Sequence, residues 1–273
     1  MSNSESDKPQ NATTPPKPFI NWVGGKRKIA DKLIEYIPSG LNNYYEPFLE
    51  GGALFFAIKD KFKKYFLSDI NLDLITSYNT VKKYPEELTN LYFSHYKNHS
   101  KQYFEKLRNI NNSNDPTAIT AKFIYLNRYS FKGIYRLNRK GQITSSFSLK
   151  NPDNSNLKER LKQCSSFLND AFIYAVDFSF IEPQENDFVY FDPPYHKAGE
   201  RFYTSMPFTE QDQIRLRDFA TELNSKNVKF MISNSDTPFI RNIYSDFNIH
   251  SIEIKYLITC QSKISKEVVI TNY

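Results

Sequence analysis

The stretch NDFVYFDPPYHK, from Asn186 to Lys197, contains a short apolar run that ends on an acid and two prolines. Residues 187–191 are predicted to form a buried strand, because the four residues that follow Asp187 are aromatic or β-branched. Proline fixes φ and lacks an N–H donor, so the run ends at Asp192. In open α/β sheets, ligands bind beyond the carboxyl ends of the strands. The stretch therefore predicts a core strand that carries a carboxylate to such an edge.

The Asp-Pro-Pro-Tyr segment offers hydrogen-bond acceptors without neighbouring donors. The prolines leave their carbonyl groups free of competing amides, and an ionised Asp192 can only accept. Tyr195 adds a flat face on which an aromatic ring can stack. Such a site suits an exocyclic amine on a planar heterocycle. The alternative is a rigid proline-rich loop that binds nothing.

Similar runs elsewhere in the chain alternate with helical patterns. Strands are predicted at 44–49, 65–69, 171–177, 187–192 and 228–233, and helices at about 26–37, 52–60, 72–83 and 210–225. Strands that alternate with helices predict an α/β fold whose mainly parallel sheet carries helices on both faces. Two further runs, 248–254 and 266–273, predict an antiparallel hairpin at the C-terminal end of the sheet.

Residues of roughly 84–165 interrupt this alternation. They contain no buried strand pattern, and helices are predicted at about 101–111 and 116–126. We therefore predict a helical subdomain at 84–165, inserted into a domain made of 18–83 and 166–273. Residues 1–17 are polar and rich in proline, which predicts a disordered tail.

The composition favours a folded protein with a polyanionic partner. The chain has 273 residues, 40% of them hydrophobic, a net charge of +6 and a pI near 9.0. A positive excess favours nucleic acid because phosphate neutralisation releases counterions, although many basic proteins bind none. No apolar run reaches the roughly 18 residues of a membrane helix. The first residues lack a secretory pattern, and the two cysteines suggest no disulfide framework, so we expect a cytoplasmic protein.

Two glycine-containing stretches predict ligand contacts. FINWVGGKRK (19–28) places a Gly-Gly turn before a helix, which suits a carboxylate or phosphate, although the spacing is not that of a Walker loop. EPFLEGGALFF (46–56) runs from a strand into glycines and a helix, and the next strand ends at Asp69. An acid at that place is typical of a ribose contact in nucleoside-binding sheets. The alternatives are an ordinary turn and a helix cap.

A basic and aromatic segment, LNRYSFKGIYRLNRKGQ (126–142), lies in the predicted insert. Arginine and asparagine pair with guanine and adenine edges, whereas lysine and tyrosine suit phosphates, so we expect DNA contacts rather than a solvated loop. The candidate DNA contacts are Arg128, Lys132, Tyr135, Arg136, Asn138, Arg139 and Lys140. His95 and His99 lack a third ligand in sequence, so no metal site is expected.

Taken in order, these motifs resemble the Dam-type (DpnII-like) DNA adenine-N6 methyltransferases. They are W-x-G-G-K, E-P-F-x-x-G-G, a strand ending in Asp, an insert with R-x-x-F-x-G-x-Y-R-x-N, and D-P-P-Y, and the resemblance runs from about Phe19 to Tyr273. SNSD (233–236) and the terminal VVITNY are also similar. The resemblance implies a Rossmann-like methyltransferase sheet, S-adenosyl-L-methionine as cofactor, double-stranded DNA as partner and a helical target-recognition insert.

The resemblance also implies roles for individual residues. The cofactor-binding residues would be Trp22, Gly24, Gly25, Lys26, Glu46, Pro47, Phe48, Asp69, Ile70, Asp177, Phe178 and Asp192. The catalytic motif would be Asp192, Pro193, Pro194 and Tyr195. Asp192 and the Pro193 carbonyl would accept both N6 hydrogens of a flipped adenine stacked on Tyr195, and methyl transfer would be in line.

The chain departs from the family pattern at three places. Glu50 stands where glycine is usual, and a glutamate there either crowds the cofactor or turns outward. Asn21, a further candidate DNA contact, replaces a lysine that contacts guanine in GATC enzymes, and ITSSFS (143–148) replaces F-N-V-P. GATC is the first target expected, with another short palindrome as the alternative. The alternatives in function are a degenerate DNA-binding relative and an RNA base methyltransferase.

A cognate restriction endonuclease is a candidate partner of an enzyme of this kind, and we expect the protein itself to be a monomer. Restriction-modification systems pair a methyltransferase with an endonuclease of the same specificity, which is why the partner is considered. Neither expectation follows from a residue pattern in the chain.

Overall fold

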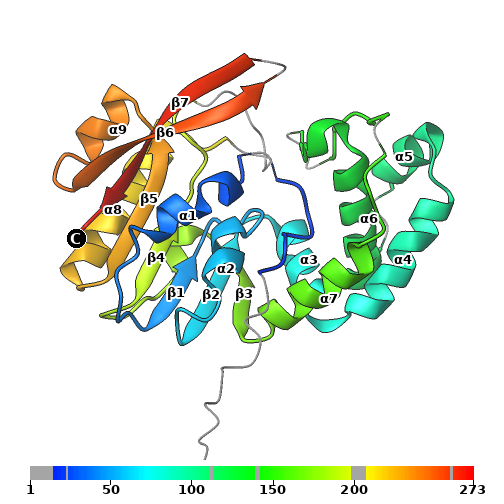
Figure 1. The fold of residues 1–273 in the computed structure, drawn as a ribbon, viewed down its shortest axis with the longest axis horizontal. Helices are drawn as coiled ribbons and strands as arrows, with labels where there is room; N and C mark the ends of the chain where they lie inside the picture. The colour runs from blue at the N-terminus through cyan, green and yellow to red at the C-terminus, as the bar shows by residue number, and fades with distance from the viewer. Residues whose placement is uncertain are drawn as a thin grey trace, which may run out of the picture.

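The computed structural model describes residues 15–22, 24–110, 113–138, 142–149, 151–197, 207–258 and 261–273. Its centre is a seven-stranded sheet in the order β3-β2-β1-β4-β5-β7-β6 (Figure 1). The strands are β1 (Asn43–Glu46), β2 (Lys64–Asp69), β3 (Ala171–Ala175), β4 (Phe188–Phe191), β5 (Lys229–Ser235), β6 (Asn248–Ile258) and β7 (Gln261–Thr271). The first five run parallel, and β7 pairs antiparallel with both β5 and β6. The predicted fold class and the C-terminal hairpin are therefore confirmed.

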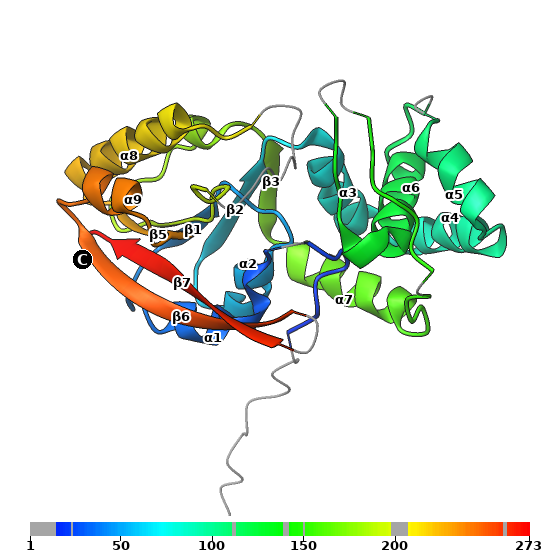
Figure 2. The ribbon, with the colours of Figure 1, turned by 90° about the horizontal axis from the view of Figure 1, so that it is seen from above.

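Alternating side chains divide the core into two parts, one on each face of the sheet. In β1, Tyr44 packs into one part and Tyr45 into the other. Helices α1 (Ala30–Ile34), α2 (Ala53–Ile58) and α3 (Leu72–Lys83) contribute buried residues to the first part. Helices α8 (Glu210–Ser225) and α9 (Pro238–Ile243) contribute to the second. Figure 2 shows α8 and α9 on the face opposite α1 and α2.

The strand order reverses between β1 and β4. From β1 the chain proceeds outward to β2 and β3, and from β4 it proceeds the other way to β5. The crevice beyond the carboxyl ends at such a switch point is where ligands bind in open α/β sheets. Because β1 ends at Glu46 and β4 at Phe191, the Glu46 and Asp192 regions meet at this crevice.

Among the described residues, four α-helices and the short η2 (Phe131–Gly133) follow α3 and precede β3, and they lie beside the sheet in both views (Figures 1 and 2). The α-helices are α4 (Pro85–Lys97), α5 (Lys101–Arg108), α6 (Pro116–Tyr129) and α7 (Leu157–Leu168). The Ser100 and Asp115 side chains cap α5 and α6 by accepting from backbone amides in the first turn. The division into a catalytic domain and a target-recognition subdomain stays a prediction. Its boundary at 84–165 leaves the last residues of α7 outside the predicted insert.

The insert is tied to the segment before η1 (Lys26–Lys28) by one buried amide. The Asn127 Oδ1 atom accepts from the Asn21 backbone amide at 2.9 Å, and Asn127 Nδ2 donates to the Asn21 carbonyl at 2.7 Å. Asn127 Nδ2 also donates to the Gly133 carbonyl at 3.3 Å. Next to this clamp, the rings of Trp22 and Tyr135 stack at a centroid distance of 5.8 Å. The N-terminal segment and the insert therefore share one set of buried contacts.

Several element boundaries differ from the sequence predictions. β1 stops at Glu46 because Pro47 follows, although the apolar run continues to Leu49. The last residues of the predicted disordered tail, 1–17, are packed against the rest of the protein. Pro16 is buried, and the Lys17 carbonyl accepts a hydrogen bond from Cys164 Sγ. Residues 1–14 of the predicted tail lie outside the described residues. In the described part of the chain, no helix has the length and apolar character needed to cross a membrane.

The insert also contains two helices, α4 and α7, that were not predicted. His95 and His99 flank the end of α4, and their Nδ1 atoms lie 2.7 Å and 2.8 Å from the Tyr103 and Tyr125 hydroxyls. They are thus partners in an aromatic core. No group of side chains suited to a metal ion is found among the described residues.

Gly133→Ala is expected to destabilise the protein more than Gly40→Ala. Both glycines have positive φ, 67° and 79°, where an alanine costs about 1–2 kcal/mol. A Cβ at Gly133 would lie 2.7 Å from the Asn21 Cβ, whereas one at Gly40 would meet nothing within 4 Å. Urea unfolding measures the loss of unfolding free energy in both variants. Because both share the backbone strain, the difference between the two losses reports the steric overlap with Asn21. Equal losses would show that Asn21 can shift to accommodate the added Cβ at no measurable cost in free energy.

Candidate active site

A small cavity lies where the ends of β1 and β4 meet η1. It is lined by Gly25, Lys26, Glu46, Leu49, Glu50, Gly51, Gly52, Ala53, Leu54, Tyr190 and Asp192. The strand ends supply the acids, and the Gly-Gly turns bring backbone close to the cavity. A Cβ at Gly51, for instance, would lie 3.2 Å from the Trp22 Cβ. The two glycine stretches and the Asp-Pro-Pro-Tyr segment, far apart in sequence, thus meet in one place.

Lys26 and Asp192 form a buried ion pair in this site. The Lys26 Nζ atom lies 2.8 Å from Asp192 Oδ1, and each side chain is less than a tenth exposed. The same Nζ donates to the Gly24 carbonyl at 3.0 Å and lies 4.6 Å above the centroid of the Tyr195 ring. An amino group already sits between the carboxylate and the ring face. The site therefore has the geometry to hold a nitrogen that donates to Asp192 while it lies over Tyr195.

Burial dominates the ionisation of the nearby acids. It raises the pKa of Glu46 to about 8; the Tyr44 hydroxyl, which donates to Glu46 Oε2 at 2.9 Å, lowers that pKa and Asp192 raises it further. Burial also raises the pKa of Asp69 to about 6, although the backbone amides of Asn71 and Glu50 oppose the shift. The pKa of Asp192 is raised by burial as well, against the opposing effect of Lys26. The site is rich in carboxyl groups that hold protons more tightly than usual.

Glu50, which stands where the family usually has glycine, lines the cavity. It therefore does not turn outward, which was one of the two possibilities considered from the sequence. Its φ is +46°, a left-handed conformation that favours glycine. Its amide donates to Asp69 Oδ2 at 3.1 Å, and its carbonyl accepts from the Tyr78 hydroxyl at 3.1 Å. Burial first, and then the charge of Asp192, raise the pKa of Glu50 well above its ordinary value, while Lys26 lowers it. The residue adds a further acid to the cavity at some conformational cost.

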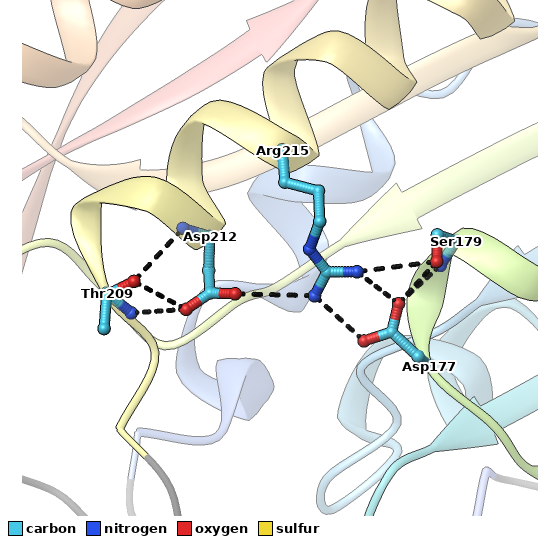
Figure 3. Close-up of polar contacts among 5 residues, drawn as sticks. All are labelled: Asp177, Ser179, Thr209, Asp212 and Arg215. Carbon is cyan, nitrogen blue, oxygen red and sulfur yellow. Dashed lines mark hydrogen bonds and ion pairs between the residues drawn. The ribbon is translucent and has the colours of Figure 1, made fainter.

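A second cluster surrounds Asp177 and is shown in Figure 3. Arg215 of α8 binds both Asp177 oxygens, at 2.7 Å and 3.0 Å, and the Ser179 amide and hydroxyl donate to Oδ1. Burial alone would raise the pKa of Asp177, but the hydrogen bonds from Arg215 and Ser179 hold it below its ordinary value. Asp212, which shares a capping box with Thr209, lies 3.5 Å from the Arg215 guanidinium. Asp177 is thus a firmly ionised carboxylate.

The predicted cofactor residue Phe178 is enclosed by the same cluster. Its ring stacks on Phe48 at a centroid distance of 5.4 Å, and the Arg215 guanidinium lies 4.2 Å from its centroid. Phe178 is only 2% exposed, whereas Ile70, next to Asp69, is 61% exposed. Sequence analysis did not identify Arg215, because only the fold brings α8 beside Asp177. An arginine in the first turns of a surface helix carries no recognisable signal by itself.

The predicted DNA contacts separate into buried and surface residues. Arg128 is buried and donates to the Asn154 side chain and the Asp153 carbonyl. Its guanidinium is therefore engaged within the insert, and a DNA contact by this residue stays a prediction. Helix α6 continues through Tyr129, which turns Arg128 toward the helical core. Tyr135 is also buried, against Trp22, and its hydroxyl donates to Asp73 Oδ2 at 3.3 Å. Both residues hold the insert together.

Two of the remaining candidates, Arg136 and Asn138, follow η2 (Phe131–Gly133). Arg136 is exposed, and Asn138 pairs with Gln142 through both side-chain and backbone groups. The Asn21 backbone is held by Asn127, while its side chain is exposed. Arg139 and Lys140 lie outside the described residues, as does the side chain of Lys132.

Comparison with known proteins assigns this arrangement to a family. The model of the D12 class N6 adenine-specific DNA methyltransferases matches residues 22–258. The chain is 36% identical to the type II methyltransferase M1.LlaDCHI of Lactococcus lactis subsp. cremoris, over 94% of this chain and 95% of the relative. It is 35% identical to the type II methyltransferase M.MjaIII of Methanocaldococcus jannaschii, over 94% and 99%. It is 30% identical to the DNA adenine methylase of Escherichia coli strain K12, over 92% of each chain.

The protein is expected to be more stable at about pH 6 than at about pH 8.5. The folded-state pKa of Glu46, about 8, lies above its ordinary value of 4.5. The stability that protonated Glu46 contributes is therefore lost as the pH rises from its ordinary pKa to its folded-state pKa. Glu46→Gln should flatten the dependence, because glutamine does not ionise, whereas the exposed Glu105→Gln should leave it unchanged. Urea unfolding across this range measures it. A wild-type stability that rises toward high pH would contradict the burial effect.

Glu50→Gly is expected to stabilise the protein, by at least about 1 kcal/mol more than Asp60→Gly at neutral pH. Both residues have positive φ, 46° and 77°, so both changes relieve the same kind of strain. Only Glu50→Gly also removes an acid whose pKa burial has raised. Thermal unfolding of the two variants gives the comparison. An equal effect would mean that the Glu50 carboxyl carries no penalty in the cavity.

Proposed function

This chain belongs to the D12 class of N6 adenine-specific DNA methyltransferases, and on that premise we propose which chemistry its site performs. The proposed reaction transfers a methyl group from S-adenosylmethionine to adenine N6 within a short palindrome of double-stranded DNA. The target base is proposed to leave the helix and enter the pocket formed by Asp192, Pro193, Pro194 and Tyr195. GATC is the first palindrome to test.

One observation carries the proposal: the position of the Lys26 ammonium. It lies 2.8 Å from Asp192 Oδ1 and 4.6 Å above the Tyr195 ring. An adenine stacked on Tyr195 and donating from N6 to Asp192 would place its amino group in the same region. The pocket is therefore complementary to a nitrogen donor on a stacked ring, as an adenine-specific enzyme requires. Lys26 must move aside before a base can enter.

The donor set of the crevice fits S-adenosylmethionine, which carries a sulfonium, an ammonium and a carboxylate. Lys26 and the Gly24–Gly25 turn would hold the carboxylate, and the acids Glu46 and Glu50 would face the cationic end. Asp69, at the carboxyl end of β2, would accept from the ribose hydroxyls, with Asp177 and Phe178 near the adenine. When bound, the cofactor supplies an electrophilic methyl group.

The residues of the chain activate and position the amine. The N6 lone pair of adenine is delocalised into the ring, which makes it a poor nucleophile. Asp192 and the Pro193 carbonyl would accept its two hydrogens and so favour a tetrahedral nitrogen. The carboxylate also stabilises the positive charge that develops on N6, in a site where burial strengthens the effect. The new N6–C bond would form as the bond from the methyl carbon to the sulfonium sulfur breaks. The amine then becomes acidic, and its proton would pass to the Asp192 carboxylate and on to solvent.

DNA is the proposed macromolecular partner. The net charge of +6 supports it, and Arg136 and Asn138 lie in the loop of the insert that is proposed to reach the bases. Arg128 and Tyr135 are proposed to support that loop from within. The relatives named type II methyltransferases make a cognate endonuclease a natural partner to seek. A monomeric enzyme is proposed.

Asp192→Ala is expected to lower methyl transfer by at least about a hundredfold while cofactor binding is largely retained. The measurement is transfer of labelled methyl groups to duplex DNA, with cofactor affinity followed by calorimetry. Asp170→Ala serves as the control, because Asp170 is an exposed acid paired with Lys59 outside the crevice.

Two results would sink the proposal. Absence of N6-methyladenine in mixed duplex DNA at high wild-type enzyme concentration would favour the degenerate DNA-binding alternative. Preferential transfer to RNA over DNA would favour the RNA base methyltransferase.

A further inference from the structure

Tyr195 is held by three side chains from three other elements. They are Gln213 of α8, Asn234 of β5 and Glu267 of β7, and each is at most 4% exposed. None belongs to the Asp-Pro-Pro-Tyr segment, and none lines the small cavity beside Lys26. Glu267 contacts Tyr195 itself, whereas the other two side chains contact the residues on either side of it in the chain. All three therefore act around the proposed stacking face of the base pocket.

Two of these side chains fix the peptide groups on either side of Tyr195. Gln213 Nε2 donates to the Pro194 carbonyl at 2.8 Å, and Asn234 Oδ1 accepts from the His196 amide at 3.1 Å. The two amides are joined, since Asn234 Nδ2 donates to Gln213 Oε1 at 3.0 Å. Because these peptide groups flank Tyr195, the contacts restrain both of its backbone dihedrals. Buried amides with satisfied partners are costly to disturb.

The third side chain fixes the far end of the ring. The Tyr195 hydroxyl donates to Glu267 Oε2 at 2.8 Å. Glu267 is in register with Ser235 of β5, so it lies one residue along from the Asn234 contact. A hydrogen bond to a carboxylate is stronger and more directional than one to a neutral acceptor. With its backbone and its hydroxyl both held, the ring plane is set before any base arrives.

We propose that Glu267 is a positioning residue that holds the Tyr195 ring for stacking of the target base. Gln213 and Asn234 support it by holding the backbone on either side of Tyr195. The inference rests on the proposed function of the pocket.

The Glu267 side chain accepts the hydrogen bond of the Tyr195 hydroxyl, and this contact carries the positioning role. The charge of Glu267 also acts on the Lys26–Asp192 pair, since it raises the pKa of both partners. A ring held in advance lowers the entropic cost of ordering the base against it.

The test uses duplexes in which 2-aminopurine replaces the target adenine. Its fluorescence rises when it leaves the DNA stack and is quenched again when it stacks on an aromatic ring. Glu267→Ala is expected to bind the cofactor as the wild type does, to give a longer aminopurine lifetime, and to lower kcat by roughly tenfold or more. Glu253→Gln, an exposed change on the neighbouring strand β6, is the control and should match the wild type.

Tyr195→Phe removes the same hydrogen bond from the other side and keeps the ring. If Glu267 acts through the Tyr195 hydroxyl, the two single variants should share one phenotype, and the double variant should be no worse than either. This arm also decides the question if Glu267→Ala fails to fold.

Wild-type lifetime and kcat in Tyr195→Phe, or additive losses in the double variant, would overturn the positioning role. Failure of the wild type itself to methylate or to change the aminopurine signal would overturn the proposed function, and the role of Glu267 with it. The two failures are therefore distinguishable.

Discussion

Burying the Asp192 carboxylate at the edge of the sheet is the constraint on which the other features of the site depend. A buried charge needs a partner, and Lys26 supplies it at 2.8 Å. That contact requires the N-terminal segment to cross over the crevice. A Gly24 φ of +93° permits a turn there, and the Lys26 side chain donates to the Gly24 carbonyl within the same segment. The ends of β1 and β4 are thereby joined to a segment that belongs to neither strand. The acids around the pair hold their protons more tightly than usual chiefly because burial penalises their charged forms.

The sequence predicted the sheet well because each strand carries its own apolar signal. The convergence of Glu46, Asp69 and Asp192 also followed from sequence, since parallel strands bring their carboxyl ends to one edge. Helix α4 was missed because its buried face consists of Leu88, Thr89 and Tyr92, which form no clear aliphatic stripe. Helix α7 does bury three leucines and Cys164 at helical spacing, a pattern that was overlooked in the sequence. Strand β1 was predicted too long because its apolar run continues past the proline that ends it.

Side-chain contacts were harder to predict from sequence than helices and strands. Arg128 has the composition of a DNA contact, but its direction depends on where α6 ends and on which residues cover that turn. Gln213, Asn234 and Glu267 could not be connected with Tyr195 from sequence, because their partners are 19, 38 and 72 residues away along the chain. Contacts of that range are set by the strand order, and no local pattern encodes them. Glu50 was recognised as unusual, but whether it faced the cavity depended on its left-handed backbone.

The Asn127 clamp and the Trp22–Tyr135 stack bear on how such enzymes acquire new specificity. Inserting the helical region between β2 and β3 suggests a cassette that evolution or an engineer could exchange without touching the chemistry. The clamp limits that freedom, because Asn127 is bound to the backbone of Asn21 and Tyr135 lies against Trp22. A transplanted cassette must bring a matching amide and ring, or the N-terminal segment must be transplanted with it. On the proposed function, the insert and the N-terminal segment would then pass together from one enzyme to another.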